Sequence, residues 1–202
     1  MTILSKNCRA LVVAALACAG SARAQPCTPL AAALAAAPKF EAYRVARPSL
    51  ARPAPLDLRG NAAARRYRTA LREAQREGPN FAGRYTIAGW GCGTGCLDWG
   101  VIDSASGKVT FDAGIRTLQN PAEDWDRYKK ATEIYARRGA NRADFDLLLF
   151  RRDSALLITL EPRIQDAARE GLARDGIAYW RWNGRRFARV HFVPAKSICR
   201  AG

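Results

Sequence analysis

From residue 84 onward, short apolar runs and alternating apolar and polar residues are separated by turn residues, a pattern typical of β-strands. The pattern predicts seven strands, at 84–90, 97–103, 108–112, 146–150, 155–160, 177–182 and 186–193. The turns between them are short, and Asn183-Gly184 is a strong hairpin signal. Consecutive strands joined this tightly pair antiparallel. We therefore expect one antiparallel sheet of about seven strands, made of a meander and hairpins.

Helical spacing of apolar residues appears mainly outside these strands. We expect two or three helices, from an alanine-rich stretch at 28–37, an amphipathic stretch at 61–77 that ends at Gly78-Pro79, and a stretch at 120–138. Helical character at 163–173 is weak. Four prolines at 38–56 predict an extended segment. The expected fold is α+β, with an Ala/Pro-rich N-terminal arm at 25–56 and a single domain at 57–202.

The N-terminus has the order of features found in a secretory signal. Lys6 and Arg9 precede an apolar run at 10–20, and Ala22-Arg23-Ala24 is a small-x-small cleavage site. We therefore expect residues 1–24 to be removed, so that the mature chain begins at Gln25 and is periplasmic or secreted. A lipoprotein signal is the alternative, in which Cys18 carries a lipid. No later apolar run is long enough to predict a transmembrane segment.

Four of the six cysteines remain after this cleavage, and an even number in an exported chain favours disulfides. Three pairings are possible. We prefer Cys92–Cys96, which closes a tight loop, and Cys27–Cys199, which joins the two ends of the mature chain.

The glycine-rich segment that carries Cys92 and Cys96 allows three interpretations. It is a structural hairpin connection, a reactive thiol pair, or a binding loop whose exposed amides hold an anion. In the binding interpretation, Trp90 and Trp99 flank the loop around Thr94. The Cys-x-x-x-Cys spacing between strands differs from the Cys-x-x-Cys at a helix N-terminus that redox pairs use.

Arginine dominates the charge of the chain. The 202 residues include 33 lysines and arginines against 18 acids, and the net charge of +15 becomes +12 without the three basic residues of the signal. Guanidinium groups recognise phosphate and carboxylate, so an anionic envelope polymer is a candidate partner. Export and the lack of a nucleic-acid-binding motif argue against nucleic acid.

The last hairpin is both aromatic and basic. Trp180 and Trp182, with Arg185 and Arg186, form a candidate surface for a glycan, an anionic polymer or another envelope protein. Packing of the rings across the strands is the simpler interpretation.

Residues for catalysis or metal binding are scarce. His191 is the single histidine, so the sequence holds no zinc pattern, and a histidine-dependent triad would have to use it. We find no motif for a cofactor. Carboxylate pairs such as Asp98 with Asp103, or Glu123 with Asp124, would need a cleft that holds them at a defined separation.

Several segments between residues 80 and 193 resemble a family of uncharacterised exported bacterial proteins. The most specific is Trp-Gly-Cys-Gly-Thr-Gly-Cys at 90–96, and the others lie at 81–85, 102–103, 106–109, 153–158 and 179–187. The resemblance implies export and a common fold, but the family has no established activity to transfer. We expect a disulfide-stabilised periplasmic protein without catalysis that binds an anionic envelope component. The alternatives are a thiol-disulfide oxidoreductase using Cys92 and Cys96, a carboxylate hydrolase, and an inhibitor or accessory subunit.

Overall fold

A computed structural model of the chain describes residues 27–46, 52–59, 61–94, 96–112, 115, 117–119, 125–142, 147–161 and 175–199. The expected signal with its cleavage site, Cys18, the helix start at 120–123 and the weakly helical stretch 163–173 lie outside these ranges, so those interpretations stay predictions.

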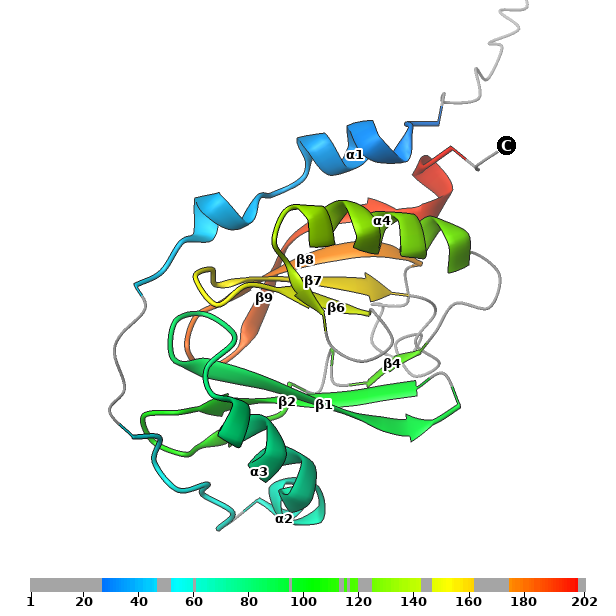
Figure 1. The fold of residues 1–202 in the computed structure, drawn as a ribbon. Coiled ribbons are helices and arrows are strands. Elements are labelled where there is room, and N and C mark those ends of the chain that lie inside the picture. The colour runs from blue at the N-terminus through cyan, green and yellow to red at the C-terminus, as the bar shows by residue number, and fades with distance from the viewer. Residues whose placement is uncertain are drawn as a thin grey trace, which may run out of the picture.

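The fold is α+β, and its strands form two antiparallel sheets (Figure 1). The four-stranded sheet contains β1 (Tyr85–Gly93), β2 (Cys96–Asp103), β3 (Val109–Thr110) and β4 (Thr117–Gln119). The five-stranded sheet has the order β5 (Asn141–Arg142), β6 (Leu148–Phe150), β7 (Leu156–Glu161), β8 (Gly176–Trp182) and β9 (Phe187–Pro194).

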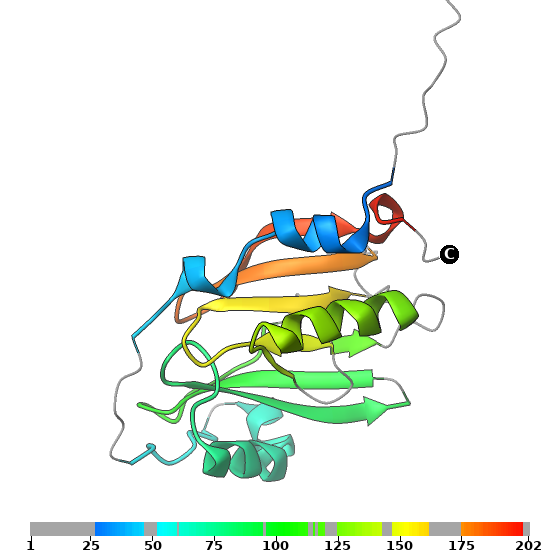
Figure 2. The same cartoon turned by 45° about the horizontal axis from the view of Figure 1, so that its top comes forward.

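Helices cover the outer faces of both sheets. Figures 1 and 2 place α1 (Leu30–Ala36) and α4 (Trp125–Arg137) on one side of the five-stranded sheet, and α2 (Ala62–Arg66) and α3 (Arg68–Glu77) beyond the four-stranded sheet. No helix within the described ranges has the length and apolar character needed to cross a membrane.

The expectation of one sheet of about seven strands is wrong in its sheet count. The seven expected strands are present with shifted ends, and β4 and β5 are additional, but they are only three and two residues long and leave no clear sequence pattern. Six consecutive residues of β2 are buried. A strand buried on both faces needs cover on both sides, which here comes from the second sheet and from α2 and α3.

The number of helices also differs from the two or three expected, because the described residues contain four α-helices. The stretch 61–77 is divided at Tyr67, whose backbone (φ −100°, ψ 20°) separates α2 from α3. Its ring stacks on Trp90 at 4.5 Å, and its hydroxyl donates to Asp98. Phe40–Tyr43 form a 3-10 turn instead of continuing an extended arm, and they bury Phe40.

The core has two parts. The larger one lies between the sheets and extends to α1 and α4, and Leu97, Trp99 and Val101 of β2 belong to it. The smaller part lies beneath α2 and α3, and contains Leu71 and Ile102. The alternation of side chains along β2 therefore divides its residues between the two cores.

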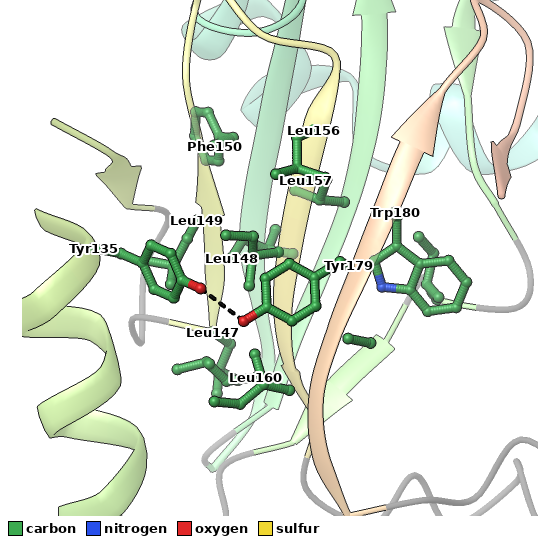
Figure 3. Close-up of a cluster of buried hydrophobic side chains, with 14 of the residues drawn as sticks. Tyr135, Leu147, Leu148, Leu149, Phe150, Leu156, Leu157, Leu160, Tyr179 and Trp180 are labelled. Atoms are coloured by element: carbon green, nitrogen blue, oxygen red, sulfur yellow. Dashed lines mark hydrogen bonds between the residues drawn. The ribbon is translucent and has the colours of Figure 1, made fainter. Parts of the chain in front are cut away.

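A pair of tyrosines bonds within the larger core. Tyr135 of α4 and Tyr179 of β8 are almost fully buried, and their hydroxyl oxygens are 2.7 Å apart (Figure 3). Burial is the largest cause that raises the pKa of both hydroxyls above their usual value. Both groups are therefore neutral near pH 7 and satisfy each other in an apolar environment.

Position 107 requires a glycine because its backbone has a positive φ and because the backbone of Pro55 lies close to it. Its φ is +72°, and a Cβ at this position would lie 1.8 Å from the backbone oxygen of Pro55. The N–H of Asp57 donates to the Gly107 oxygen at 2.8 Å. The end of the proline-rich segment is thus held directly against the turn between β2 and β3.

Candidate functional site

Both preferred disulfides are present in the structure. Cys27 and Cys199 have Cα atoms 4.8 Å apart, and a parallel bridge between Thr28 and Ile198 lies beside them. Cys92 and Cys96 have Cα atoms 5.1 Å apart at the end of the β1–β2 hairpin. These separations are normal for disulfides.

The hairpin is longer than expected, and its connecting loop is correspondingly shorter. β1 continues to Gly93, so only residues 94 and 95 separate it from β2, and the register shifts between Gly91 and Gly93. Cys92 and Thr94 are exposed. Both cysteines lie on strand ends rather than at the helix N-terminus that usually activates a thiol.

The expectation that Trp90 and Trp99 flank this loop together is wrong. Trp90 pairs with Asp98 in the register, so it lies on the opposite face of the sheet from Trp99. Trp99 is only 2% exposed, and its Nε1 donates to the backbone oxygen of Ile115 at 2.6 Å. On one face of the sheet Trp90 stacks on Tyr67, and on the other face Trp99 is buried in the larger core.

Docking through the rings of Trp180 and Trp182 is also excluded, because these residues are 8% and 4% exposed. Trp180 donates from Nε1 to Thr159 Oγ1 at 2.8 Å, and Trp182 packs on Phe187 with ring centroids 4.6 Å apart. The simpler interpretation, packing between strands, is confirmed.

The arginines of the same hairpin are exposed. The backbone N–H groups of Arg185 and Arg186 both donate to Asn183 Oδ1, at 2.9 and 3.0 Å. This turn leaves their side chains at the surface.

The carboxylates of β2 cannot work as a catalytic pair. Asp98 and Asp103 lie on opposite faces of the strand, about 16 Å apart along it at ~3.3 Å per residue. Asp98 accepts from Thr117 Oγ1 at 2.5 Å, and Asp103 forms an ion pair with Arg84 at 3.0 Å. Glu123 and Asp124 lie outside the described residues.

His191 is exposed on β9 and lies beside the ring of Tyr179, with ring centroids 5.4 Å apart. Among the described residues, no group of three or more His, Cys, Asp or Glu side chains could hold a metal ion.

The described residues line an open groove of about 690 Å³, here called the arm groove. One wall is the N-terminal segment at 42–45, and the other contains Tyr85, Ala155 and the end of β8 with Arg181 and Trp182. Residues far apart in the sequence therefore build it.

A network of hydrogen bonds around the β6–β7 turn holds the N-terminal wall in place. The buried Ser154 Oγ donates to the Phe40 oxygen at 2.8 Å. The N–H of Val45 donates to the Asp153 oxygen at 2.9 Å, and the N–H of Ala155 donates to the Tyr43 oxygen at 2.8 Å. Positions 43–45 therefore behave like a short added strand beside the turn.

The same turn connects to both sheets. The N–H of Ala82, just before β1, donates to the Ser154 oxygen at 3.2 Å, and the N–H of Trp182 donates to the Ala155 oxygen at 2.9 Å. The turn thus sets the distance between the arm, the start of β1 and the end of β8, which are the three parts that line the groove.

The charge of the arm groove is positive. Its described lining includes Arg44 and Arg181 and no acidic residue. The nearby acids Glu41 and Asp153 are both bonded to Arg151, at 2.5 and 2.9 Å. A backbone hydrogen bond, with further contributions from Arg151 and Arg44, lowers the pKa of Glu41. Arg151 supplies one positive charge against these two acids, and Arg44 also interacts with Glu41. The two arginines of the lining therefore make the groove itself positive, while acids outside the lining offset part of their field.

The sequence pattern indicated few of the residues that line this groove. Arg44 lies in the proline-rich arm without a motif, and Arg181 was hidden between two tryptophans chosen for their rings. The hairpin arginines Arg185 and Arg186 are absent from its described lining, although Arg185 lines a second hollow that shares Tyr85, Trp182 and Gly184 with it.

No protein-family model, no curated protein and no solved structure matches this chain. The resemblance to a family of exported proteins therefore stays a prediction, and the functional argument depends on the geometry.

Proposed function

We propose that the protein is an exported, disulfide-stabilised binding protein, and that its arm groove takes an anionic component of the cell envelope. The observation that carries the proposal is the pair Arg44 and Arg181 beside aromatic side chains, in a groove whose described lining contains no acidic residue. The signal pattern and the two disulfides support an oxidising compartment.

The chemistry of the groove suits a charged glycan or a phosphate polymer. Guanidinium groups bind carboxylate and phosphate through two parallel hydrogen bonds. Tyr43 and Tyr85 line the same groove and offer ring surface beside those charges. An open groove can accept part of a long chain, whereas a closed cavity selects a small molecule.

The test is binding of two probes, polyphosphate and polygalacturonate, to the chain that begins at Gln25, over a range of salt concentrations. The Arg44→Gln/Arg181→Gln variant should bind at least tenfold more weakly and show a shallower salt dependence, because two fewer anion contacts release counterions. The control is Arg72→Gln/Arg76→Gln, which removes the same charge from the exposed side of α3.

The control variant should bind within about twofold of the parent, because exposed charges remote from the groove contribute little to the binding free energy. Equal losses in both variants would mean that net charge alone attracts the polymer. Binding of neither probe, at any salt concentration, would contradict the proposal.

The second candidate is a thiol-disulfide oxidoreductase, which the exposure of Cys92 at a hairpin end favours. In a glutathione buffer poised at about −270 mV, a catalytic pair should be at least partly reduced, whereas structural disulfides, with potentials below about −300 mV, stay mostly oxidised. Alkylation and peptide mapping of Cys92 and Cys96 would decide, because a fully oxidised pair under these conditions contradicts a redox role.

A further inference from the structure

One edge of the four-stranded sheet is only partly covered. β1 is an edge strand, since β2 is its only neighbour in the sheet. Every second residue of β1 points both its backbone N–H and its backbone oxygen away from β2. At Tyr85 these groups bond to the backbone at 80–81. At Ile87 the side chain of Asn80 takes their place, accepting from the N–H at 2.8 Å and donating to the oxygen at 3.1 Å.

The next two outward positions are glycines without such partners. The alternation that turns Ile87 toward Asn80 also turns the N–H and oxygen of Gly89 and Gly91 outward. Within the described part of the chain, no group forms a hydrogen bond with either glycine on that edge. A Cβ at Gly91 would meet nothing within 4 Å. Glycine in an edge strand lets another backbone approach closely.

A groove lies along this edge, here called the edge groove, with a volume of about 280 Å³. Asn80, Ile87 and Gly89 form its floor, and the same face of α3 that carries Ala70 and Ala74 forms one wall. The small alanine side chains leave space beside the strand.

The wall from α3 also carries negative charge. Glu73 and Glu77 lie on the same helical face as the alanines and are exposed at the groove. They form an acidic rim on a chain whose net charge is +15. Arg142 and Phe150 lie on the opposite wall. The acidic rim favours an occupant with positive side chains along one side.

We propose that Gly89–Gly91 is a β-augmentation site for an extended peptide segment that carries lysine or arginine. The peptide backbone bonds to the free N–H and oxygen groups of the two glycines, and its cationic side chains lie against Glu73 and Glu77. Asn80 ends the pairing on one side, and the register shift after Gly91 ends it on the other. The site therefore takes a short segment, with register set by these two stops.

The test follows backbone amides by NMR hydrogen exchange in the chain that begins at Gln25. The probe is a capped heptapeptide of alternating lysine and threonine, with two controls: alternating glutamate and threonine, and the lysine peptide N-methylated on alternate amides. The lysine peptide should slow exchange at Gly89 and Gly91 at least tenfold, because their free N–H groups become bonded. Neither control peptide should do so.

Two charge-reversal variants test the rim. Glu73→Lys/Glu77→Lys should weaken binding of the lysine peptide at least tenfold. Asp126→Lys/Glu133→Lys makes the same charge change at exposed positions of α4 and should leave affinity within twofold.

Three results would overturn the proposal. In the first, the peptide perturbs other amides but leaves Gly89 and Gly91 in fast exchange. In the second, the glutamate peptide binds equally well. In the third, protection of these glycines rises with protein concentration and without peptide, which would assign the edge to a second copy of the chain.

Discussion

The buried tyrosine pair allows a quantitative test of the core. Tyr135 and Tyr179 are 2% and 0% exposed, and the described residues contain no other hydrogen-bond partner for either hydroxyl. Tyr135→Phe leaves the Tyr179 hydroxyl buried without a partner, and Tyr179→Phe does the same to Tyr135. Each single variant should lower the free energy of unfolding by about 1–3 kcal/mol, the cost of an unsatisfied buried group.

The double variant Tyr135→Phe/Tyr179→Phe should be more stable than the sum of the single changes predicts. It removes both hydroxyls and keeps both rings, so we expect a loss of less than about 1 kcal/mol. The interaction energy from the cycle should therefore exceed about 1 kcal/mol in magnitude.

The assay is urea denaturation at pH 7, with equal m-values as the condition for comparing midpoints. Tyr43→Phe is the control, because Tyr43 is half-buried and its hydroxyl has no described hydrogen bond, so it should change stability by less than about 0.5 kcal/mol. Additive losses in the double variant would refute the mutual satisfaction of the two hydroxyls.

Three further predictions concern pH, the disulfides and a turn. The raised pKa values of the tyrosine pair stabilise the fold below pH ~10, and above that pH the tyrosines of the unfolded chain ionise first. The free energy of unfolding should therefore fall by about 1.4 kcal/mol per pH unit for each tyrosine. Urea titrations at alkaline pH should show this slope in the parent and not in the double phenylalanine variant. Replacing Cys27 and Cys199 by serine should lower the free energy of unfolding by about 5 kcal/mol in the chain-entropy model, because the two residues are 172 positions apart. Replacing Cys92 and Cys96, which are 4 positions apart, should lower it by about 2 kcal/mol. Equal shifts in the urea midpoint would contradict this order. Gly107→Ala should destabilise by more than about 2 kcal/mol, because the new Cβ meets Pro55 backbone and φ is positive, and a melting temperature within 2 °C of the parent would contradict it.

Local patterns predicted the elements that depend on neighbouring residues. The Asn183-Gly184 hairpin forms as expected, with Asn183 bonding the following amides. The cysteine pairing was reached from loop length and from the position of Cys27 and Cys199 near the two ends of the mature chain.

Relations between distant residues were not accessible in the same way. The alternation of residues predicts a strand but does not indicate which hairpins share a sheet. For this reason the sequence predicted one sheet where the structure has two. The break at Tyr67 depends on its contacts with Trp90 and Asp98, which are far away in the sequence.

The candidate site illustrates the same limit. Aromatic residues were selected because rings bind ligands at surfaces, yet Trp99, Trp180 and Trp182 have their rings in the core. Composition cannot distinguish a ring that packs between sheets from one that is exposed. The arm groove instead depends on Arg44 and Arg181, which the β6–β7 turn brings together across more than half of the chain.

The bond between Cys27 and Cys199 makes the chain between them a covalent ring. The polypeptide enters and leaves the fold at one point, with Thr28 and Ile198 paired beside it. A single protease cut in any loop within the ring would release no fragment until the disulfide is reduced. New ends can therefore be opened in a loop elsewhere in the ring, because the bond between Cys27 and Cys199 keeps the two parts of the chain joined.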